Sequence, residues 1–409
     1  MRKILYIGNF EFPYGNAAGK RVYGNGKLFR AIGYDTLFIG MNQTNINTSV
    51  NIQDTKCVFD NFQYYNIGYP KKNIEWLNYK DIFENVINFI EEENIKSDLD
   101  AIIYYGSPRL SLFIYLLIKW CKNNNIKIIS DSVDWLSSNS NNIIFNIIKF
   151  LDTTYQKAYL NKRVDGVIAI STYLSKYYTD SGVNTIVIPP LAFESIINID
   201  KFNLKNNELN ICYAGLPFRK NNLITNPKIL KDRIDRTIIL FSKLINISFV
   251  FNIYGFTKEE YLKVLPNQKI YIDKLNKNIV FHGYVDNAQV IDNIKKADFT
   301  ILLRDIKKDT MAGFPTKVSE SLSYGTPVIT TNTSDLGMYI DDGLNGFFLD
   351  IDDEDKALIK LKKILKLDKK IIFEMKNTCI SRNSFYYINY LESMKIFLNI
   401  NKKNKGSRY

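Results

Sequence analysis

The sequence predicts an α/β protein built from two doubly wound parallel-sheet domains. Its 409 residues are roughly two to three times the usual domain size. Short apolar runs, rich in β-branched and aromatic residues, alternate with helical patterns. Strands that are apolar on both faces belong to parallel sheets covered by helices. The alternation occurs twice, on either side of the stretch 189–200, which begins with two prolines and has no clear period.

The expected strands form two sets, one for each domain. Those of the first set are 3–8, 36–40, 101–106, 127–132, 166–171 and 185–190, and those of the second are 209–215, 248–255, 278–285, 299–304, 327–331 and 346–350. The domain boundary is therefore expected between about residue 190 and residue 208. Ligands of open α/β sheets bind beyond the carboxyl ends of the strands, so two such domains offer a cleft between them.

Composition excludes several classes of protein. Hydrophobic residues make up 46% and charged residues 23%, which argues against global disorder. His282, the only histidine, lies in the apolar segment 281–285, so neither a histidine zinc cluster nor a histidine-based triad is expected. The four cysteines are far apart, as in a cytosolic protein with reduced thiols. The apolar stretch 110–120 is too short to span a membrane and predicts a buried helix.

The net charge of +12 is concentrated at the C-terminus. Residues 361–409 contain twelve Lys/Arg and three Asp/Glu, which leaves only +3 for the rest of the chain. One interpretation is a solvated helix face followed by a frayed tail. The alternative is an electrostatic contact with an anionic membrane surface or with nucleic acid, although no nucleic-acid module is visible.

The first strand is followed by a glycine-containing loop and then by a helix to about residue 32. The residues of interest in this loop and the first helical turn are Gly15, Asn16, Gly19, Lys20 and Arg21. Glycines allow close approach of the backbone, and a basic helix N-terminus suits a phosphate or carboxylate. The spacing matches neither the dinucleotide fingerprint nor the P-loop. A ligand loop and a purely structural loop therefore both remain open.

Two further segments follow strands of the first domain and are expected at the same edge. Arg109 is a candidate partner for a phosphate. Asp131 and Asp134 are candidates to accept hydrogen bonds from sugar hydroxyls or to act as a base. The alternative for the aspartate segment is helix capping by Ser130 or Asp131.

The second domain carries the more specific pattern. Arg219 and Lys220 follow the glycine turn at Gly215, where cations can neutralise a departing diphosphate without a metal. Further along the chain, a Gly/Pro loop opens a helix with Thr316 and Lys317 in its first turn. Backbone N–H groups at such a terminus hold phosphate oxygens. Glu320, about one turn later, is placed to hold a ribose diol.

The segment 314–329 resembles the donor-site signature of the family 4 (group 1) retaining glycosyltransferases, which have the GT-B fold of two facing Rossmann-like domains. Further matches are found in 168–174, 281–285 and 335–347. The resemblance implies an acceptor-side domain over 1–190, a nucleotide-sugar domain over 208–378 and a C-terminal helix over 380–400 that returns to the first domain. The apolar residues of 385–398 supply the stripe for that return.

The resemblance also implies roles for individual residues. Glu320 matches the second glutamate of the family's Glu-x7-Glu motif, whereas the position of the first is occupied by Ala312. Arg219 and Lys220 match the family's diphosphate-binding residues. Asp131 and Asp134 are assigned by position only, because the family's frequent N-domain histidine has no counterpart. The implied donor site contains Gly215, Tyr254, Gly283, Tyr284, Arg304, Gly313, Phe314, Pro315, Thr316, Lys317 and Glu320.

The expected activity is transfer of a sugar, of hexosyltransferase type, from a nucleotide-sugar donor to a growing glycan or lipid-linked acceptor, with retention of configuration, in polysaccharide or glycoconjugate biosynthesis. No cofactor or metal is expected, and no nucleic-acid partner. The expected location is cytoplasmic, with peripheral attachment at the inner face of the membrane through the basic C-terminal segment. A catalytically silent partner subunit, suggested by Ala312, and a nucleotide-sugar epimerase of the same fold remain alternatives.

Overall fold

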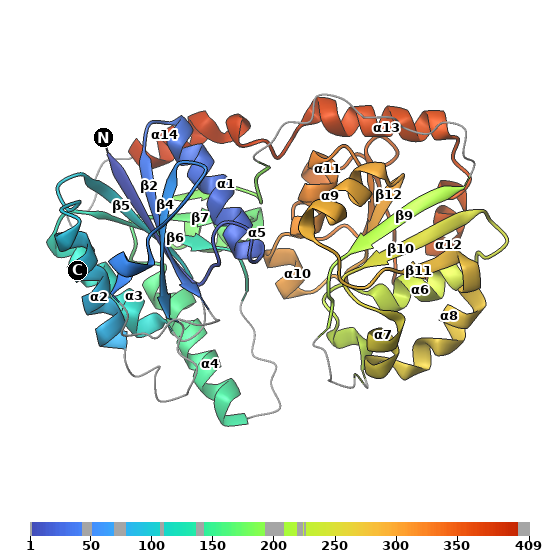
Figure 1. Ribbon diagram of the computed structural model, residues 1–409, viewed down its shortest axis with the longest axis horizontal. Helices are drawn as coiled ribbons and strands as arrows, with labels where there is room; N and C mark the ends of the chain where they lie inside the picture. The colour runs from blue at the N-terminus through green and yellow to red at the C-terminus, as the bar shows by residue number, and fades with distance from the viewer. Residues whose placement is uncertain are drawn as a thin grey trace. The chain divides into compact units, whose positions relative to one another are not determined.

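A computed structural model describes residues 2–42, 51–68, 79–106, 110–135, 143–192, 208–218, 224 and 226–399. The chain divides into two compact units (Figure 1). The first unit comprises residues 1–193, 312–314 and 387–409, and the second comprises 194–311 and 315–386.

The first unit is built on an eight-stranded sheet in the order β3-β4-β2-β1-β5-β6-β7-β8. All neighbouring strands are parallel except β3 and β4. The strands are β1 (Lys3–Gly8), β2 (Asp35–Asn42), β3 (Cys57–Phe59), β4 (Phe62–Gly68), β5 (Leu99–Tyr105), β6 (Lys127–Ser132), β7 (Gly166–Ala169) and β8 (Thr185–Val187). The chain winds outward from β1 in both directions, so the strand order reverses between β1 and β5. Ligands of doubly wound sheets bind at such a reversal.

The hairpin of β3 and β4 was not predicted from the sequence. Its two-residue turn, Asp60 and Asn61, has φ values of +47° and +59°. Positive φ at both central residues is the geometry of a tight hairpin turn, and Asp and Asn tolerate it. The Asp-Asn pair between two apolar runs was the signal that could have found this hairpin.

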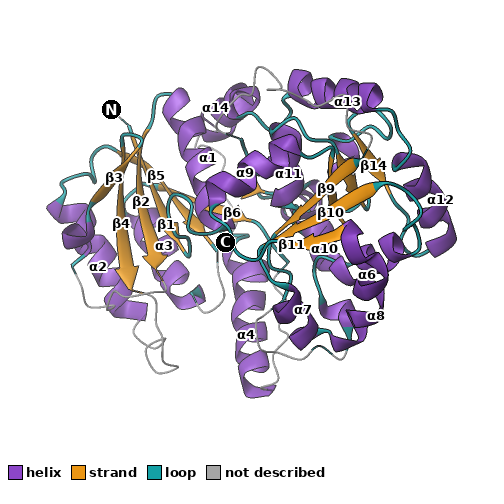
Figure 2. Ribbon diagram, turned by 45° about the vertical axis from the view of Figure 1, so that its right-hand side comes forward, coloured by secondary structure: helices purple, strands orange, loops and turns teal. Residues whose placement is uncertain are grey.

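The helices of the first unit flank its sheet (Figure 2). They are α1 (Ala17–Ala31), α2 (Tyr79–Glu92), α3 (Ser111–Asn123), α4 (Ile143–Tyr155), α5 (Thr172–Thr179) and α14 (Leu391–Asn399), with a π-helical turn at Gln156–Leu160 after α4. The C-terminal helix α14 packs in the main core of this unit, where Met394, Phe397 and Leu398 are buried. A Cβ atom at Gly166 would lie 2.6 Å from the ring of Phe397, so the glycine in β7 makes room for α14.

The second unit has a six-stranded, fully parallel sheet in the order β11-β10-β9-β12-β13-β14. The strands are β9 (Leu209–Ala214), β10 (Phe249–Tyr254), β11 (Ile279–Phe281), β12 (Phe299–Leu302), β13 (Val328–Thr330) and β14 (Gly346–Phe348). The order reverses between β9 and β12. Any ligand of this sheet is therefore expected beside the carboxyl ends of these two strands.

Several helices of the second unit begin at a capping side chain. They are α6 (Ile234–Ser242), α7 (Lys258–Val264), α8 (Lys269–Leu275), α9 (Asn287–Lys296), α10 (Lys308–Ala312), α11 (Thr316–Ser323), α12 (Glu354–Ile364) and α13 (Lys369–Arg382). Asp286, Asp353 and Asp368 cap α9, α12 and α13 with their carboxylates. Helix α13 ends where Asn383 adopts a left-handed conformation with φ +41°.

The predicted fold class is confirmed, because both units are doubly wound α/β structures. Each of the twelve predicted strands is present, with ends that differ by a few residues. Cys121 and Cys212 are buried and form no disulfide, consistent with the reduced thiols expected from the sequence. No helix among the described residues has the length and apolar character needed to cross a membrane.

Candidate functional site

Three glycines lie close together at the carboxyl ends of β9, β10 and β11. Gly215, Gly255 and Gly283 have φ values of +148°, +116° and +68°, which disfavour side chains. The Gly255 N–H donates to the Gly283 carbonyl at 2.7 Å, and a Cβ atom at Gly255 would lie 2.6 Å from the Gly215 carbonyl oxygen. We call these three residues the glycine ledge. It gives a ligand access to the backbone beside the strand-order reversal.

Lys317 lies against this ledge. It is in the first turn of α11, and a Cβ atom at Gly215 would lie 2.3 Å from its Nζ. The ammonium pairs with Asp232 and donates to the hydroxyl of Tyr213 at 3.1 Å. Its side chain remains 31% exposed. A cation is therefore held at the end of β9 and stays accessible from solvent.

Asp232 links Lys317 to Arg304, which follows β12. The Arg304 Nε donates to Oδ1 of Asp232 at 2.8 Å, and the Tyr213 hydroxyl donates to Oδ2 at 3.1 Å. Burial opposes ionisation of Asp232, but the two cations outweigh it and hold the pKa of this carboxyl well below its usual range. The two cations and one carboxylate of this cluster carry a net charge of +1.

A second ion cluster fixes the segment that carries Asp232. The guanidinium of Arg233 binds Asp235 at 2.9 Å and Asp305 at 2.5 Å. The Arg233 N–H donates to the carbonyl of Leu303 at 2.7 Å. These bonds tie the start of α6 to the end of β12. Asp232 is thereby held at the strand-order reversal.

The N-terminus of α11 adds positive potential. Its N-cap is Pro315, which provides no side-chain hydrogen bond, and the first turn contains no acidic residue. The N–H groups of a first helical turn and the helix dipole favour an anion at such an end. Thr316 and Glu320 are half-buried on the same helix, while Gly313, Phe314 and Pro315 are buried just before it.

Two tyrosines of the expected donor site, Tyr254 and Tyr284, differ in exposure. Tyr254 is buried at the end of β10, and burial raises the pKa of its hydroxyl to about 12. The ring of His282 stacks on Tyr254 at 4.4 Å, and its Nε2 lies 2.8 Å from Oδ1 of Asn252. These contacts give His282 a structural role. Tyr284 is 84% exposed and extends into solvent beside Gly283.

The candidates of the first loop have structural partners. Oδ1 of Asn16 accepts from the Gly19 N–H at 2.8 Å and caps α1. Side chains at Gly15 and Gly19 would collide with Glu11, so both glycines are required for packing. Lys20 is half-buried in the first turn of α1.

Arg21 and Asp131 form a buried ion pair in the first unit. Nη2 of Arg21 lies 2.7 Å from Oδ1 of Asp131, and its Nη1 donates to the Ile188 carbonyl at 2.8 Å. Tyr6 also donates to Asp131, whose side chain is inaccessible to solvent. These contacts favour a structural role for both residues over the roles expected from the sequence.

Asp134 lies instead in a polar pocket of the first unit. Its lining consists of Gly106, Asp131, Ser132, Val133, Asp134, Thr153, Gln156, Lys157, Asn161 and Tyr178. Nε2 of Gln156 is buried there, and no group in the described residues pairs with it. This pocket lies at the ends of β5 and β6, where polar ligand groups are expected.

Three predicted site residues, Arg109, Arg219 and Lys220, lie outside the residues that the structure describes. The contribution of Asp232 was missed by sequence reasoning, because it lies in the charged run 231–236, which is typical of a solvated helix end. Within the described ranges, no group of three or more His, Cys, Asp or Glu side chains is arranged to hold a metal ion.

The second unit is thus an α/β domain with a cationic, glycine-lined strand end. Residues 223–383 match the family model described as glycosyl transferases group 1. The predicted resemblance to that family is confirmed.

One curated protein is also similar in sequence to this chain. An uncharacterized 41.2 kDa protein in the cps region of Klebsiella pneumoniae is 24% identical over 215 residues, which are 50% of this chain and 53% of the relative. The match thus spans only about half the length of that relative.

Solved structures match over nearly the whole chain. Sucrose-phosphate synthase of Thermosynechococcus elongatus has a TM-score of 0.68 at 12% identity, over 97% of this chain and 98% of the other. HepE of Anabaena, in complex with UDP and glucose, has a TM-score of 0.61 at 13% identity, over 97% and 99%. At these identities the likeness shows the fold, which is GT-B.

Proposed function

We propose that this protein transfers a sugar from a nucleotide-sugar to a growing glycan, with retention at the anomeric carbon. The observation that carries the proposal is the position of Lys317 at the glycine ledge beside the uncapped N-terminus of α11. Both features suit the diphosphate of a donor. The match of residues 223–383 to group 1 glycosyltransferases supports this assignment.

The chemistry follows from charge. As the bond between the sugar and the diphosphate breaks, negative charge grows on the departing phosphate oxygen. Lys317 and the α11 N–H groups stabilise that charge more strongly in the transition state than in the bound donor. Asp232 and Arg304 orient Lys317, so the ammonium needs little rearrangement. The mechanism is proposed to need no metal.

The remaining donor contacts are proposed from their positions. Glu320 binds the ribose hydroxyls, and Tyr284 covers the nucleobase beside Gly283. Arg219 and Lys220 assist the diphosphate. The UDP complex of HepE supports a uridine nucleotide as the first donor to examine.

The acceptor is proposed to be a glycan or lipid-linked saccharide in polysaccharide biosynthesis. The cps region of the Klebsiella relative supports this class of pathway. We further propose that the enzyme is a hexosyltransferase and that it is located in the cytoplasm. It is proposed to attach peripherally to the membrane, and the basic segment 361–409 contributes positive charge to that contact.

The test is donor turnover by the purified protein with UDP-, GDP- and TDP-sugars. We expect slow hydrolysis of one donor in the absence of acceptor, and a product sugar that keeps the donor's anomeric configuration. Binding of a nucleotide without any turnover would favour the silent partner subunit that Ala312 suggests. Interconversion of two nucleotide-sugars would favour an epimerase.

The cationic pair gives a kinetic test of the same proposal. Arg219→Ala and Lys220→Ala should lower kcat more than they raise KM for the donor, because the leaving-group charge is largest in the transition state. Unchanged turnover in both variants would remove these residues from the donor site.

A further inference from the structure

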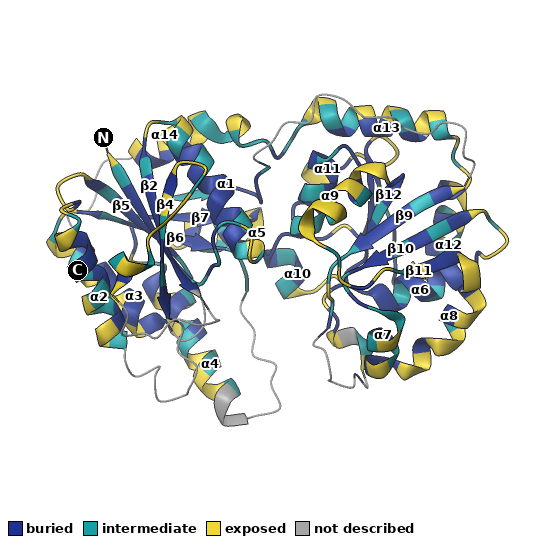
Figure 3. Cartoon of the chain, in the orientation of Figure 1, coloured by how far each residue is buried: buried dark blue, intermediate teal, exposed yellow. Residues whose placement is uncertain are grey.

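Helix α4 of the first unit exposes large apolar side chains. Ile147, Ile148, Phe150 and Leu151 are between 53% and 61% exposed. Figure 1 shows α4 projecting from its unit, and Figure 3 shows exposed residues along it. Monomeric soluble proteins rarely leave contiguous apolar surface of this kind without a partner.

The same helix turns its polar side toward the protein. Thr153 and, in the π-helical turn that follows, Gln156 are only 4% and 3% exposed. The carboxylate of Asp152 accepts from the backbone N–H and the hydroxyl of Ser111, which ties α4 to α3. Soluble surface helices normally bury the apolar stripe and expose the polar one. Among the side chains of α4 that the structure describes, residues 146–155, the arrangement is reversed.

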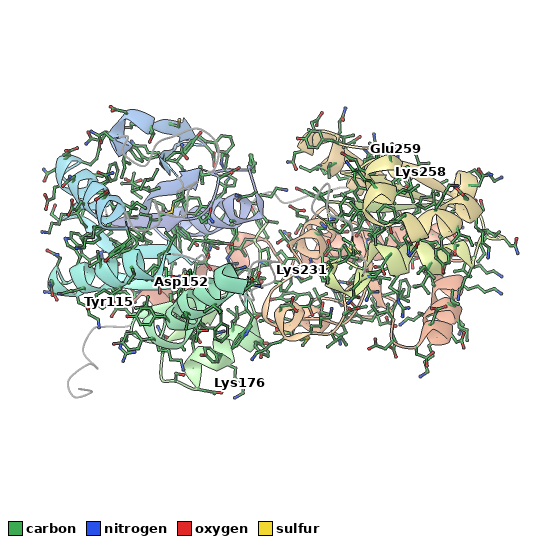
Figure 4. All side chains as sticks on the ribbon, turned by 90° about the horizontal axis from the view of Figure 1, so that it is seen from below. Tyr115, Asp152, Lys176, Lys231, Lys258 and Glu259 are labelled. Atoms are coloured by element: carbon green, nitrogen blue, oxygen red, sulfur yellow. The ribbon has the colours of Figure 1, made fainter. Side chains whose placement is uncertain are left out.

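Neighbouring residues extend the exposed surface. Leu112 and Tyr115 of α3 are 47% and 43% exposed. Figure 4 labels Tyr115 and Asp152, which come from these two helices. Tyr155 and Tyr159 stack on each other at 5.0 Å and continue the apolar side of α4. We call the exposed residues of α3, α4 and the π-helical turn the α3–α4 face.

The segments that form the α3–α4 face are rich in basic residues. Residues 111–123 and 143–163 contain six Lys or Arg and one acidic residue, Asp152. The guanidinium of Arg163 lies 3.4 Å from the centre of the Tyr159 ring, and Lys119 and Lys122 are exposed. Long basic side chains beside apolar ones, with tyrosines between them, suit the interface of an anionic bilayer.

We infer that the α3–α4 face docks on an anionic lipid surface, with α4 lying in the interface. Its 13 residues are too short to span a bilayer, whereas an interfacial helix needs only one apolar side. A second copy of the chain is disfavoured, because a twofold contact would bring the exposed cations Lys119, Lys122 and Arg163 close to their own copies. The inference does not rest on the proposed sugar transfer.

The experiment is co-sedimentation of the full chain with vesicles of phosphatidylcholine containing phosphatidylglycerol. Ile148→Gln/Leu151→Gln should lower the partition coefficient at least tenfold. The matched control is Ile270→Gln on α8, where Ile270 is 70% exposed, and it should bind as the parent does. A parent protein that stays in the supernatant, or a double variant that binds equally well, would overturn the inference.

Two further measurements distinguish docking through α4 from attachment through the C-terminal tail and from dimerisation. Phe150→Trp should gain fluorescence that brominated lipids quench, and absence of quenching in the bound protein would contradict interfacial burial of α4. Lys402→Gln/Lys403→Gln/Lys405→Gln should retain most of the binding, whereas complete loss would assign the contact to the C-terminal tail. A parent dimer that Leu151→Gln converts to a monomer would assign the face to a second copy. UDP binding, followed in parallel, reports on the donor site independently.

Discussion

The ammonium of Lys317 occupies the space that a side chain at Gly215 would fill. A Cβ atom at Gly215 would lie 2.3 Å from Nζ and 2.4 Å from Cε of Lys317. The two residues are 102 positions apart, and the sheet brings the end of β9 beside the start of α11. The glycine turn and the helix N-terminus thus form one cationic site.

Gly215→Ala should therefore displace Lys317 and weaken UDP binding by about tenfold or more, the equivalent of about 1.4 kcal/mol. The measurement is isothermal titration calorimetry. Gly343→Ala is the matched control, because Gly343 also has a positive φ (+89°) but a Cβ atom there meets only Phe347, at 4.0 Å. If both variants lose the same affinity, backbone strain rather than Lys317 explains the effect.

Asp232→Asn should lower the free energy of unfolding by about 3 kcal/mol, because it leaves Arg304 buried without its carboxylate. Urea unfolding at pH 7 measures the loss. The folded-state pKa of Asp232 is depressed, so its stabilisation is present above the ordinary carboxyl pKa and is lost as the pH falls through the folded value. Equal stability of variant and parent at pH 7 would show that this ion cluster is dispensable.

Glu320→Gln should weaken UDP binding by roughly 10- to 100-fold, since hydrogen bonds to a charged group contribute about 1.5–3 kcal/mol. The affinities for UDP and for 2′-deoxy-UDP are measured for both the parent and the variant. The parent should prefer UDP, and the variant should largely lose that preference. A variant that keeps the full preference would exclude Glu320 from the ribose site.

Lys376 gives a pH-dependent prediction away from the donor site. It is buried, and it donates to the carbonyls of Lys295 and Ala297 and to the Thr326 hydroxyl. Burial lowers the pKa of Lys376 from 10.5 to about 8. Between pH 8 and 10.5 the unfolded chain binds the proton that the folded protein has released, so this group makes stability rise with pH.

The experiment compares two proteins that differ only at position 376, where one has Lys and the other carries Lys376→Met. Both carry Cys379→Ala, because burial raises the pKa of this neighbouring thiol to about 12 and its titration would otherwise interfere. The free energy of unfolding of the Lys376 protein, relative to the Met variant, should rise by up to about 3 kcal/mol between pH 8 and 10.5. Parallel stability curves would contradict the lowered pKa.

The strands were predictable because buried parallel strands form continuous apolar runs in the sequence. The hairpin of β3 and β4 was missed because β3 has only three residues and lies at the sheet edge, so its apolar run is too short to stand out as a strand. Asp232 was missed for a different reason. Its partners Arg304 and Lys317 lie 72 and 85 residues away, and only the folded sheet brings them together.

The first-domain candidates show the limit of reasoning from position. Asp131 lies near the carboxyl end of β6, where ligand-binding residues are expected, yet its carboxylate is fully buried against Arg21. The sequence pattern predicts ligand contacts for both Arg21 and Asp131. In the structure the two residues contact each other instead. Pairing across 110 residues cannot be read from local spacing.

The proposed mechanism requires that Lys317 bind the diphosphate of the donor. Calorimetry of UDP and of uridine with the parent and with Lys317→Met measures this contact. Lys317→Met should weaken UDP binding by at least tenfold and leave uridine binding unchanged, because only UDP carries the phosphates. Equal affinities of parent and variant for UDP, or an equal loss for UDP and uridine, would show that Lys317 does not bind the diphosphate.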